Sequence, residues 1–556
     1  MEALLWAREV PAGHGIIVSE MDSSATRSGS GKLQQKHLTW LILALILGWA
    51  ALLRLAWLSY EGLWYDELYV VWARKLPLDR LIPEILASEH PPLFNIAGVF
   101  WGSIDQNEFW ARLPSALIGV VTVLLTFLTA REFFTRRTGL WAAAFAACSP
   151  LLVWYSRDAT SYSWVIALSL ASLYLLGRSC LRGGWKNWAA YTAVTLVAVY
   201  SHFSSEILLA AEAVLFVVLA RKAGDSRRPM LYSQAFLWGA LAALILASSR
   251  YFGDMQPANP LSFATLERLY FGMVRAPLVL LMGYADHRMG SQAAVPLLGK
   301  LKAVLLALWA LALAATFFSG RVRRLFADRR MVALALFGLI MVAGPVALLM
   351  LRSLETTGRY YAWAAPAVFI VMAVVVARAP RRVGAIAGAC IIAGLTLTTV
   401  YETGIRHNED FRGIMAVVDA GRREGDVLMC FPEHIGVVAA DFYLMDNIDV
   451  VGGFMDPKRL DVAFFPGGGD RWSGYLDGYI EGYHERKVME ALKGEELRER
   501  LERDLSRYQR VWLLQGKDVP GQFSSAKVVE EALAPGWEAV EAHDFPLMML
   551  KLYRRR

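Results

Sequence analysis

The chain has 556 residues, of which 56% are hydrophobic and only 19% are charged, and its formal net charge is +7. This composition excludes a disordered chain and disfavours a water-soluble globular domain, because both classes carry more polar and charged residues. Its apolar residues fall in runs close to the roughly 20 residues that span a bilayer, which predicts a polytopic membrane protein.

The N-terminal residues 1–36 form a polar segment rich in Ser, Gly and Lys. They do not have the arrangement of a cleaved signal peptide, because the first apolar run, Leu38 to Leu58, is long and no small-residue cleavage site follows it. We therefore expect residues 1–36 to be a cytoplasmic tail and Leu38 to Leu58 to be a retained anchor. Met21 is an alternative start of the chain.

About eleven long apolar segments are expected to cross the membrane. They are Leu38–Leu58, Leu113–Thr129, Leu140–Trp154, Ala159–Leu176, Trp188–Tyr200, Ile207–Ala220, Tyr232–Ser249, Val295–Phe318, Met331–Leu351, Ala362–Val376 and Val383–Val400. The segment Pro92 to Ile104 is apolar but too short to cross comfortably, so we expect an interfacial or re-entrant helix there.

Clustered Arg and Lys residues occupy every second connection between these segments. The clusters contain Arg131, Arg136, Arg137, Arg178, Arg182, Lys186, Arg221, Lys222, Arg227, Arg228, Arg321, Arg323, Arg324, Arg329, Arg330, Arg378, Arg381 and Arg382. By the positive-inside rule these loops face the cytoplasm together with the N-terminal tail. The long first loop, residues 59–112, is then on the noncytoplasmic face, and so is the chain after the last span.

Residues 401–556 differ in character from the rest of the chain. They hold 21 Lys and Arg against 28 Asp and Glu, a net charge of −7, and the other 36 basic and 22 acidic residues give the first 400 residues +14. Because the basic excess lies in the membrane part, it requires no nucleic acid as partner. In the tail, strand-like runs at 427–431, 450–454, 511–514 and 547–552 alternate with helical patterns at 411–423, 435–444 and 486–505, which predicts a small α/β domain.

The predicted fold is therefore mainly α, a transmembrane helix bundle with an extracytoplasmic C-terminal α/β domain. We divide the chain into the tail 1–36, the transmembrane domain 37–400 with its long first outer loop 59–112, and the α/β domain 401–556.

Two carboxylates, Asp66 and Glu67, follow the first span directly, and Glu89 and His90 precede Pro91 and Pro92 in the same outer loop. Charged groups are costly inside lipid but can work at its edge. A carboxylate there can act as a general base on a hydroxyl, and a nearby cation can hold a phosphate leaving group. These are the groups that glycosyl transfer from a lipid phosphate needs.

The short connection that carries Arg157 and Asp158 adds a cation and a third carboxylate to the same face. Two readings of this connection stay open. Asp158 is a candidate catalytic residue and Arg157 a candidate ligand of the donor phosphate, or the two side chains pair with neighbours and anchor their loop.

A resemblance supports the enzymatic reading. The order Asp66-Glu67, then Glu89-His90-Pro91-Pro92, then Arg112-Leu113-Pro114-Ser115-Ala116, then Trp154-Tyr155-Ser156-Arg157-Asp158 resembles the class C membrane glycosyltransferases (GT-C) over about residues 38–400. Within that class it is similar to the protein O-mannosyltransferase-like branch, which includes the aminoarabinose transferase of lipid A. The resemblance implies an inverting transferase that moves a sugar from a polyprenyl-phosphate donor to a hydroxyl of a lipid, glycan or protein.

The same resemblance implies roles for individual residues. Asp66 matches the catalytic base of the first outer loop, Glu67 supports it, and Asp158 matches a second acidic position. The expected donor-phosphate ligands are His90, Arg157, Arg359 and Tyr360. This sequence has His90 where the aminoarabinose transferase has a Lys, and a titratable imidazole suits a metal better than a permanent cation does.

Glu89, His90 and His287 could therefore bind a divalent metal such as zinc, magnesium or manganese, since they offer oxygen and nitrogen ligands. Two other classes of function were weighed. A transporter or lipid flippase would place its charges near the membrane midplane in broken helices, and the candidate charges here cluster in outer loops. A noncatalytic scaffold would fit the α/β tail but leaves the acidic pair without a purpose.

Overall fold

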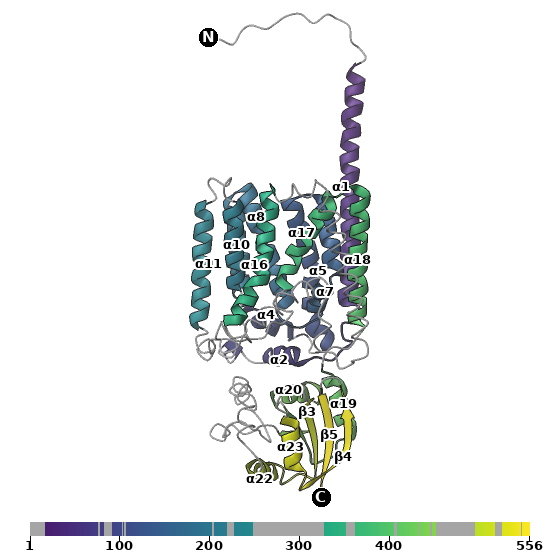
Figure 1. The fold of residues 1–556 in the computed structure, drawn as a ribbon, viewed down its shortest axis with the longest axis vertical. Helices are drawn as coiled ribbons and strands as arrows, with labels where there is room; N and C mark the ends of the chain where they lie inside the picture. The colour runs from purple at the N-terminus through teal and green to yellow at the C-terminus, as the bar shows by residue number, and fades with distance from the viewer. Residues whose placement is uncertain are drawn as a thin grey trace, which may run out of the picture.

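The computed structural model shows a bundle of long helices with a small mixed α/β domain at one end (Figure 1). The structure describes residues 17–75, 78–79, 81–82, 92–102, 104, 107–202, 205–219, 227–247, 327–351, 362–404, 409–431, 433–444, 448–451, 495–517, 525–545 and 548–556.

Long apolar helices run side by side in the bundle (Figure 1). They are α1 (Ile17–Leu55), α5 (Glu108–Phe133), α6 (Arg136–Cys148), α7 (Pro150–Ser156), α8 (Tyr162–Arg182), α9 (Trp185–Val199), α10 (Ser205–Leu219), α11 (Arg227–Ala247), α16 (Arg329–Leu351), α17 (Ala365–Arg378) and α18 (Arg381–Thr403). Among the described residues five helices are long and apolar enough to cross a membrane, or six if the bent pair α6 and α7 is one span. A mainly helical, multi-pass membrane fold is thus confirmed, whereas the expected number of eleven spans is not, and Val295–Phe318 lies outside the described residues.

The predicted span Leu140–Trp154 falls on α6 and α7, which meet at an angle of 62°. Ser149 caps α7 with its hydroxyl and Pro150 occupies the first helical position, where a missing N–H costs nothing. The bend frees carbonyls at the end of α6, and the buried Arg54 guanidinium of α1 donates to Ala146 O and Ala147 O. This bend directs α7 toward the turn that carries Arg157 and Asp158.

Two short helices lie at the end of the bundle that faces the C-terminal domain (Figure 1). Helix α2 (Tyr65–Ala73) begins with the acidic pair in its first turn, and α4 (Pro92–Gly102) falls in the segment predicted to be interfacial or re-entrant. Helices α2 and α4 and the C-terminal domain therefore share one end of the molecule (Figure 1).

The C-terminal domain is built on a five-stranded mixed sheet of strand order β2-β1-β3-β5-β4. Its strands are β1 (Asp426–Phe431), β2 (Asp449–Val451), β3 (Arg510–Gly516), β4 (Trp537–Asp544) and β5 (Met548–Arg555). Strand β1 pairs in parallel with β2 and β3, and β5 pairs antiparallel with β3 and β4. The mixed α/β character predicted for this part of the chain is confirmed.

Helices cover both faces of this sheet, because side chains alternate along each strand. Leu428 and Cys430 of β1 pack on the side of α19 (Phe411–Gly421) and α20 (Glu433–Leu444). Val427 and Met429 face α22 (Glu495–Asp504) and α23 (Ser525–Leu533) on the other side. The face with α19 and α20 also packs against α2, so α2 and the C-terminal domain share one apolar core.

Candidate functional site

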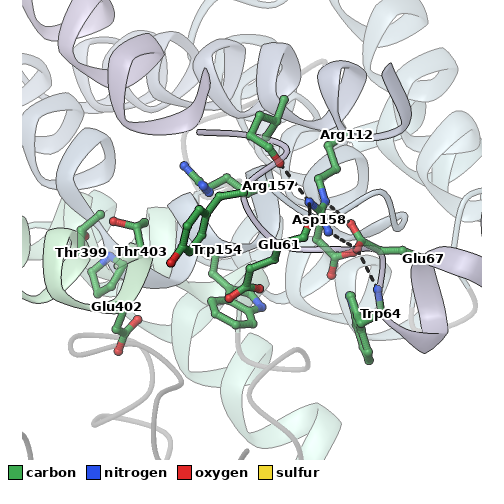
Figure 2. Close-up of a pocket in the computed structure, with 13 residues that line it drawn as sticks. Glu61, Trp64, Glu67, Arg112, Trp154, Arg157, Asp158, Thr399, Glu402 and Thr403 are labelled. Carbon is green, nitrogen blue, oxygen red and sulfur yellow. Dashed lines mark hydrogen bonds and ion pairs between the residues drawn. The ribbon is translucent and has the colours of Figure 1, made fainter. Parts of the chain in front are cut away.

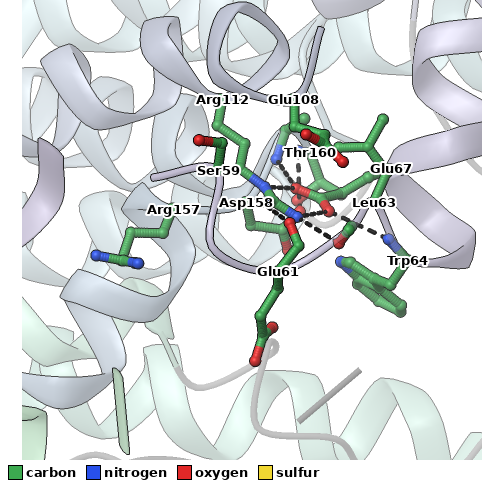
Figure 3. Close-up of polar contacts among 12 residues, drawn as sticks. Ser59, Glu61, Leu63, Trp64, Glu67, Glu108, Arg112, Arg157, Asp158 and Thr160 are labelled. Carbon is green, nitrogen blue, oxygen red and sulfur yellow. Dashed lines mark hydrogen bonds and ion pairs between the residues drawn. The ribbon is translucent and has the colours of Figure 1, made fainter. Parts of the chain in front are cut away.

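The segment between α1 and α2 is held by one arginine at the base of the bundle. Arg112 lies in the first turns of α5, is 4% exposed, and uses all five of its N–H groups. Two of them form a fork on Glu67, with Nε to Oε1 at 2.7 Å and Nη2 to Oε2 at 2.5 Å. The other three bind the backbone carbonyls of Leu58, Glu61 and Gly62 at 2.8–2.9 Å (Figure 3).

Glu67 is fully buried and has four hydrogen-bond donors around it. Beyond the two bonds from Arg112, its Oε2 accepts from the Trp64 amide at 3.3 Å, which closes half of a capping box at the start of α2. Its Oε1 accepts from the Ala159 amide at 2.9 Å and so ties α2 to the turn that carries Asp158. An ionised carboxylate accepts about four hydrogen bonds, so Glu67 keeps no lone pair for a substrate. This geometry favours the supporting role predicted for it.

Asp66 precedes Glu67 in the first turn of α2 and is only half-buried. Adjacent helical residues do not share a face, so the side chain of Asp66 leaves the helix on a different side from Glu67. The side chain of Asp66 is thus partly accessible to solvent, while its backbone is held in place by the hydrogen bonds of the neighbouring Glu67.

Asp158 is the second carboxylate of this end and is 4% exposed. Its Oδ1 accepts from the Thr160 amide at 3.2 Å, while its Oδ2 is buried and has no hydrogen-bond partner among the described residues. Burial first, and then the negative charges of Glu67 and Asp66, raise the pKa of Asp158 well above its usual range, against the opposing charge of Arg112. The carboxylates of Asp66, Glu67 and Asp158 therefore lie close to one another and to Arg112, whose N–H groups are all hydrogen-bonded.

Arg157 donates to the end of α1 in this structure. Its Nη1 binds the carbonyls of Leu53 and Ala56, at 3.4 and 2.6 Å, and its Nη2 binds that of Trp57 at 2.8 Å. Burial and the neighbouring Arg112 charge lower its pKa to about 10. These bonds cap the C-terminus of α1, which matches the anchoring alternative, and a phosphate-binding role for Arg157 stays a prediction.

A pocket opens beside Asp158, between the 58–64 segment, α7 and the end of α18 (Figure 2). Its walls combine aromatic rings, carboxylates and hydroxyls, and they are formed by Leu58, Tyr60, Glu61, Trp64, Glu67, Arg112, Pro150, Trp154, Arg157, Asp158, Thr399, Glu402 and Thr403. Such walls suit a hydroxyl-rich group. Asp66 is not among the residues that line it.

The other predicted site residues, Glu89, His90, His287, Arg359 and Tyr360, lie outside the described residues. Within the described ranges no group of three His, Cys, Asp or Glu side chains could hold a metal ion. The metal site and most of the donor-phosphate site therefore stay predictions.

Comparisons with known proteins were made for sequence and for fold. Residues 89–259 match the family model described as dolichyl-phosphate-mannose-protein mannosyltransferase. The structure is similar to two structures of ArnT from Cupriavidus metallidurans, each with 13% sequence identity and a TM-score of 0.52. The match to ArnT in the apo state covers 93% of this chain and 98% of ArnT. The match to ArnT bound to undecaprenyl phosphate covers 92% of this chain and 98% of ArnT.

The chain thus shares its fold with ArnT, and residues 89–259 match a family of mannosyltransferases. A fainter likeness links the chain to the archaeal oligosaccharyltransferase AglB from Archaeoglobus fulgidus, with 12% identity, a TM-score of 0.47, and coverage of 87% of this chain and 70% of AglB. A comparison with curated proteins gave no match. The mannosyltransferase match favours the enzymatic hypothesis over the transporter and scaffold alternatives.

Sequence reasoning missed several residues of the site. Arg112 was noted only as part of a motif, although its spacing of four residues from Glu108 places both side chains on one face of α5. Glu61, Glu402 and Thr399 had no local signal, because they reach the pocket from segments more than 300 residues apart.

Proposed function

We propose that this protein is a class C membrane glycosyltransferase that moves a sugar from a polyprenyl-phosphate donor to a hydroxyl group on the noncytoplasmic face of the membrane. The observation that carries the proposal is the pairing of a half-buried Asp66 with a fully bonded Glu67 at the start of α2. ArnT, whose fold this chain shares, binds undecaprenyl phosphate, and the matching family model describes a transferase that uses dolichyl-phosphate mannose.

In the proposed reaction Asp66 is the general base. It takes the proton of the acceptor hydroxyl as that oxygen forms a bond to the anomeric carbon, and the bond from the anomeric carbon to the phosphate oxygen breaks. The electron pair of the broken bond leaves with the polyprenyl phosphate. Attack from the face opposite the leaving group inverts the configuration of the sugar.

Asp158 assists the proton transfer to Asp66 by carrying a proton on its own carboxyl group. Because its pKa is raised, it is the carboxyl in this cluster that burial favours as the neutral acid. A neutral Asp158 lowers the negative charge near Asp66 and can donate from Oδ2 to a hydroxyl in the pocket. Its place between Glu67 and the pocket suits an orienting role toward the substrate.

The noncytoplasmic location rests on charge and on shape together. Basic residues end or begin the helices at the far end of the bundle, such as Arg182 of α8 and Arg381 of α18, whereas Asp66 and the C-terminal domain lie at the opposite end (Figure 1). The proposed acceptor is a lipid, a glycan or a protein that reaches this face. A divalent metal held by Glu89, His90 and His287 is part of the proposal, as are phosphate contacts from His90, Arg157, Arg359 and Tyr360.

The decisive experiment replaces the proposed base. Purified protein in liposomes is given undecaprenyl-phosphate mannose and undecaprenyl-phosphate pentoses, and release of undecaprenyl phosphate is measured in the presence of envelope lipids and glycans. Asp66→Asn should lower kcat by about 100- to 10,000-fold, the usual contribution of a general base, with an unchanged protein level. Full activity of Asp66→Asn would refute the assigned base.

The same assay tests the metal. Treatment with EDTA should lower the rate, and zinc, magnesium or manganese should restore it. A rate that EDTA does not change would remove the metal from the proposal and leave the assignment of Asp66 intact.

A further inference from the structure

An arginine of the C-terminal domain binds the segment between α1 and α2, which precedes Asp66. Arg412, in the first turn of α19, donates from Nη1 to the Ser59 carbonyl at 3.0 Å and from Nη2 to the Tyr60 carbonyl at 2.6 Å. It also forms an ion pair with Glu108 of α5, with Nη1 and Oε1 at 3.1 Å. One side chain thus joins the C-terminal domain, the outer segment and the bundle.

The bonds of this arginine complement those of Arg112. Arg112 binds the carbonyls of residues 58, 61 and 62, and Arg412 binds those of residues 59 and 60, so five consecutive carbonyls are each held by a guanidinium. The two arginines come from opposite sides, one from the bundle and one from the C-terminal domain. We call this arrangement the two-arginine clamp.

The clamp continues into the amides that precede α2. The Tyr443 hydroxyl of α20 accepts from the Leu63 amide at 2.8 Å and donates to Glu108 Oε1 at 3.1 Å. Glu67 then accepts from the Trp64 amide. Every backbone group that these bonds involve lies within eight residues before Asp66, so the start of α2 has little freedom to shift.

Close packing at Gly62 confirms that the two parts fit tightly. A Cβ atom at this position would lie 3.0 Å from the Arg412 Cβ and 3.2 Å from the Tyr443 hydroxyl. Beneath it, Leu68 and Trp72 of α2 share an apolar core with Phe411 and Ile414 of α19. Lys75, just after α2, adds an ion pair with Asp441 of α20 at 2.8 Å.

We propose that Arg412 and Tyr443 are positioning residues for the reaction, and that the C-terminal domain holds the base Asp66 in register with the bundle through the two-arginine clamp. The proposal rests on the proposed function, because it concerns the placement of Asp66. A displacement of about 1 Å in a reacting group costs on the order of 100-fold in rate. The C-terminal domain therefore contributes to turnover, not only to stability.

The test compares Arg412→Ala and Tyr443→Phe with a matched control in the same domain. The control is Arg554→Ala, which removes an exposed ion pair with Glu538 between β5 and β4. In the undecaprenyl-phosphate sugar assay, Arg412→Ala should lower kcat by about 10- to 100-fold with little change in the donor KM, because it misplaces a base without removing a substrate contact. Tyr443→Phe should give a smaller loss, and Arg554→Ala should match the unaltered protein.

Two further measurements separate positioning from mere stability. Hydrogen exchange at the Leu63 and Trp64 amides should be faster in Arg412→Ala and Tyr443→Phe than in Arg554→Ala. In a double-mutant cycle, Arg412→Ala should cause no further loss in the Asp66→Asn background, since it acts through Asp66. If Arg412→Ala fails to fold, the kcat, the hydrogen exchange and the double-mutant cycle of Tyr443→Phe test the positioning role instead.

The outcomes distinguish the two proposals. Unchanged kcat in Arg412→Ala and Tyr443→Phe, together with an inactive Asp66→Asn, overturns the positioning role alone. A full additional loss in the double mutant also overturns it, because Arg412 would then act on something other than Asp66. An active Asp66→Asn overturns the assigned base, and the positioning role with it.

Discussion

Helix α5 carries an arginine–glutamate pair at each of its two ends, and the two pairs have the same forked geometry in different surroundings. At the outer end Arg112 binds Glu67, and the two side chains are 4% and 0% exposed. At the opposite end Arg182 binds Glu132 with both contacts at 2.5 Å, and the arginine is 53% exposed whereas the glutamate is 3% exposed. Only the outer arginine also binds three backbone carbonyls, so only there does the pair fix the path of a loop.

The comparison teaches that the surroundings of an ion pair decide what it does. A buried pair is costly to form, and its removal leaves an uncompensated charge away from water. An exposed pair is screened by solvent and contributes little. The protein places a pair with both side chains buried next to its proposed base, and a pair with a half-exposed arginine at the other end of the same helix.

The largest effect is expected for Arg112→Ala. This change leaves Glu67 buried without its cation and should destabilise the protein by about 3–5 kcal/mol, or prevent folding. Thermal unfolding in detergent measures the loss. The double variant with Arg112→Met and Glu67→Leu should cost less than Arg112→Ala alone, because it buries no unpaired charge. Equal losses in the two variants would contradict this account of the buried pair.

An intermediate, pH-dependent effect is expected for Asp158→Asn. The pKa of Asp158 is raised in the folded protein, so the folded state holds this proton more tightly than the unfolded state does. Between the ordinary Asp pKa of about 4 and the raised pKa, its contribution to stability falls as the pH rises, by at most about 1.4 kcal/mol per pH unit.

Asn has no proton to lose, so the decline in unfolding temperature above about pH 4 should be shallower in Asp158→Asn. The variant should be at least as stable as the unaltered protein at neutral pH. A pH profile identical to that of the unaltered protein would show that Asp158 does not titrate as proposed.

The smallest effect is expected for Arg182→Ala. The Arg182 side chain is 53% exposed, so water can reach the Glu132 carboxylate once the guanidinium is gone, although that carboxylate is 3% exposed in the intact pair. The loss should therefore be smaller than that of Arg112→Ala, and high salt should shrink it further. The same thermal unfolding assay applies. A loss as large as that of Arg112→Ala would break the contrast between the two ends of α5.

Local patterns predicted much of the fold. The apolar runs correspond to helices throughout the described bundle, and the strand-like runs at 427–431 and 511–514 are part of β1 and β3. Strand β4 was missed because it lies at the sheet edge and most of its residues are exposed, which removes the apolar signal. The bend at Ser149 and Pro150 was missed because the apolar run continues through it, although the proline was a signal.

Sequence analysis nominated Asp66, Glu67 and Asp158 as carboxylates of one site. Asp66 and Glu67 stand together, and the structure brings Asp158 to them through the Ala159 amide. The division of labour between the two adjacent carboxylates depends on Arg112, which lies 45 residues further along the chain. The contacts of Arg412 and Tyr443 span more than 300 residues, so no local pattern could reveal them.

The order of synthesis gives the bond between Arg412 and Tyr60 a consequence in time. The two residues are 352 positions apart, so a ribosome that adds about 5–20 residues per second needs about 20–70 seconds to reach the second after the first. During that interval the outer segment is already in place at the membrane, while the carbonyls of residues 59 and 60 still lack the Arg412 guanidinium. A nascent chain that has not yet reached Arg412 thus carries Asp66 without its full support.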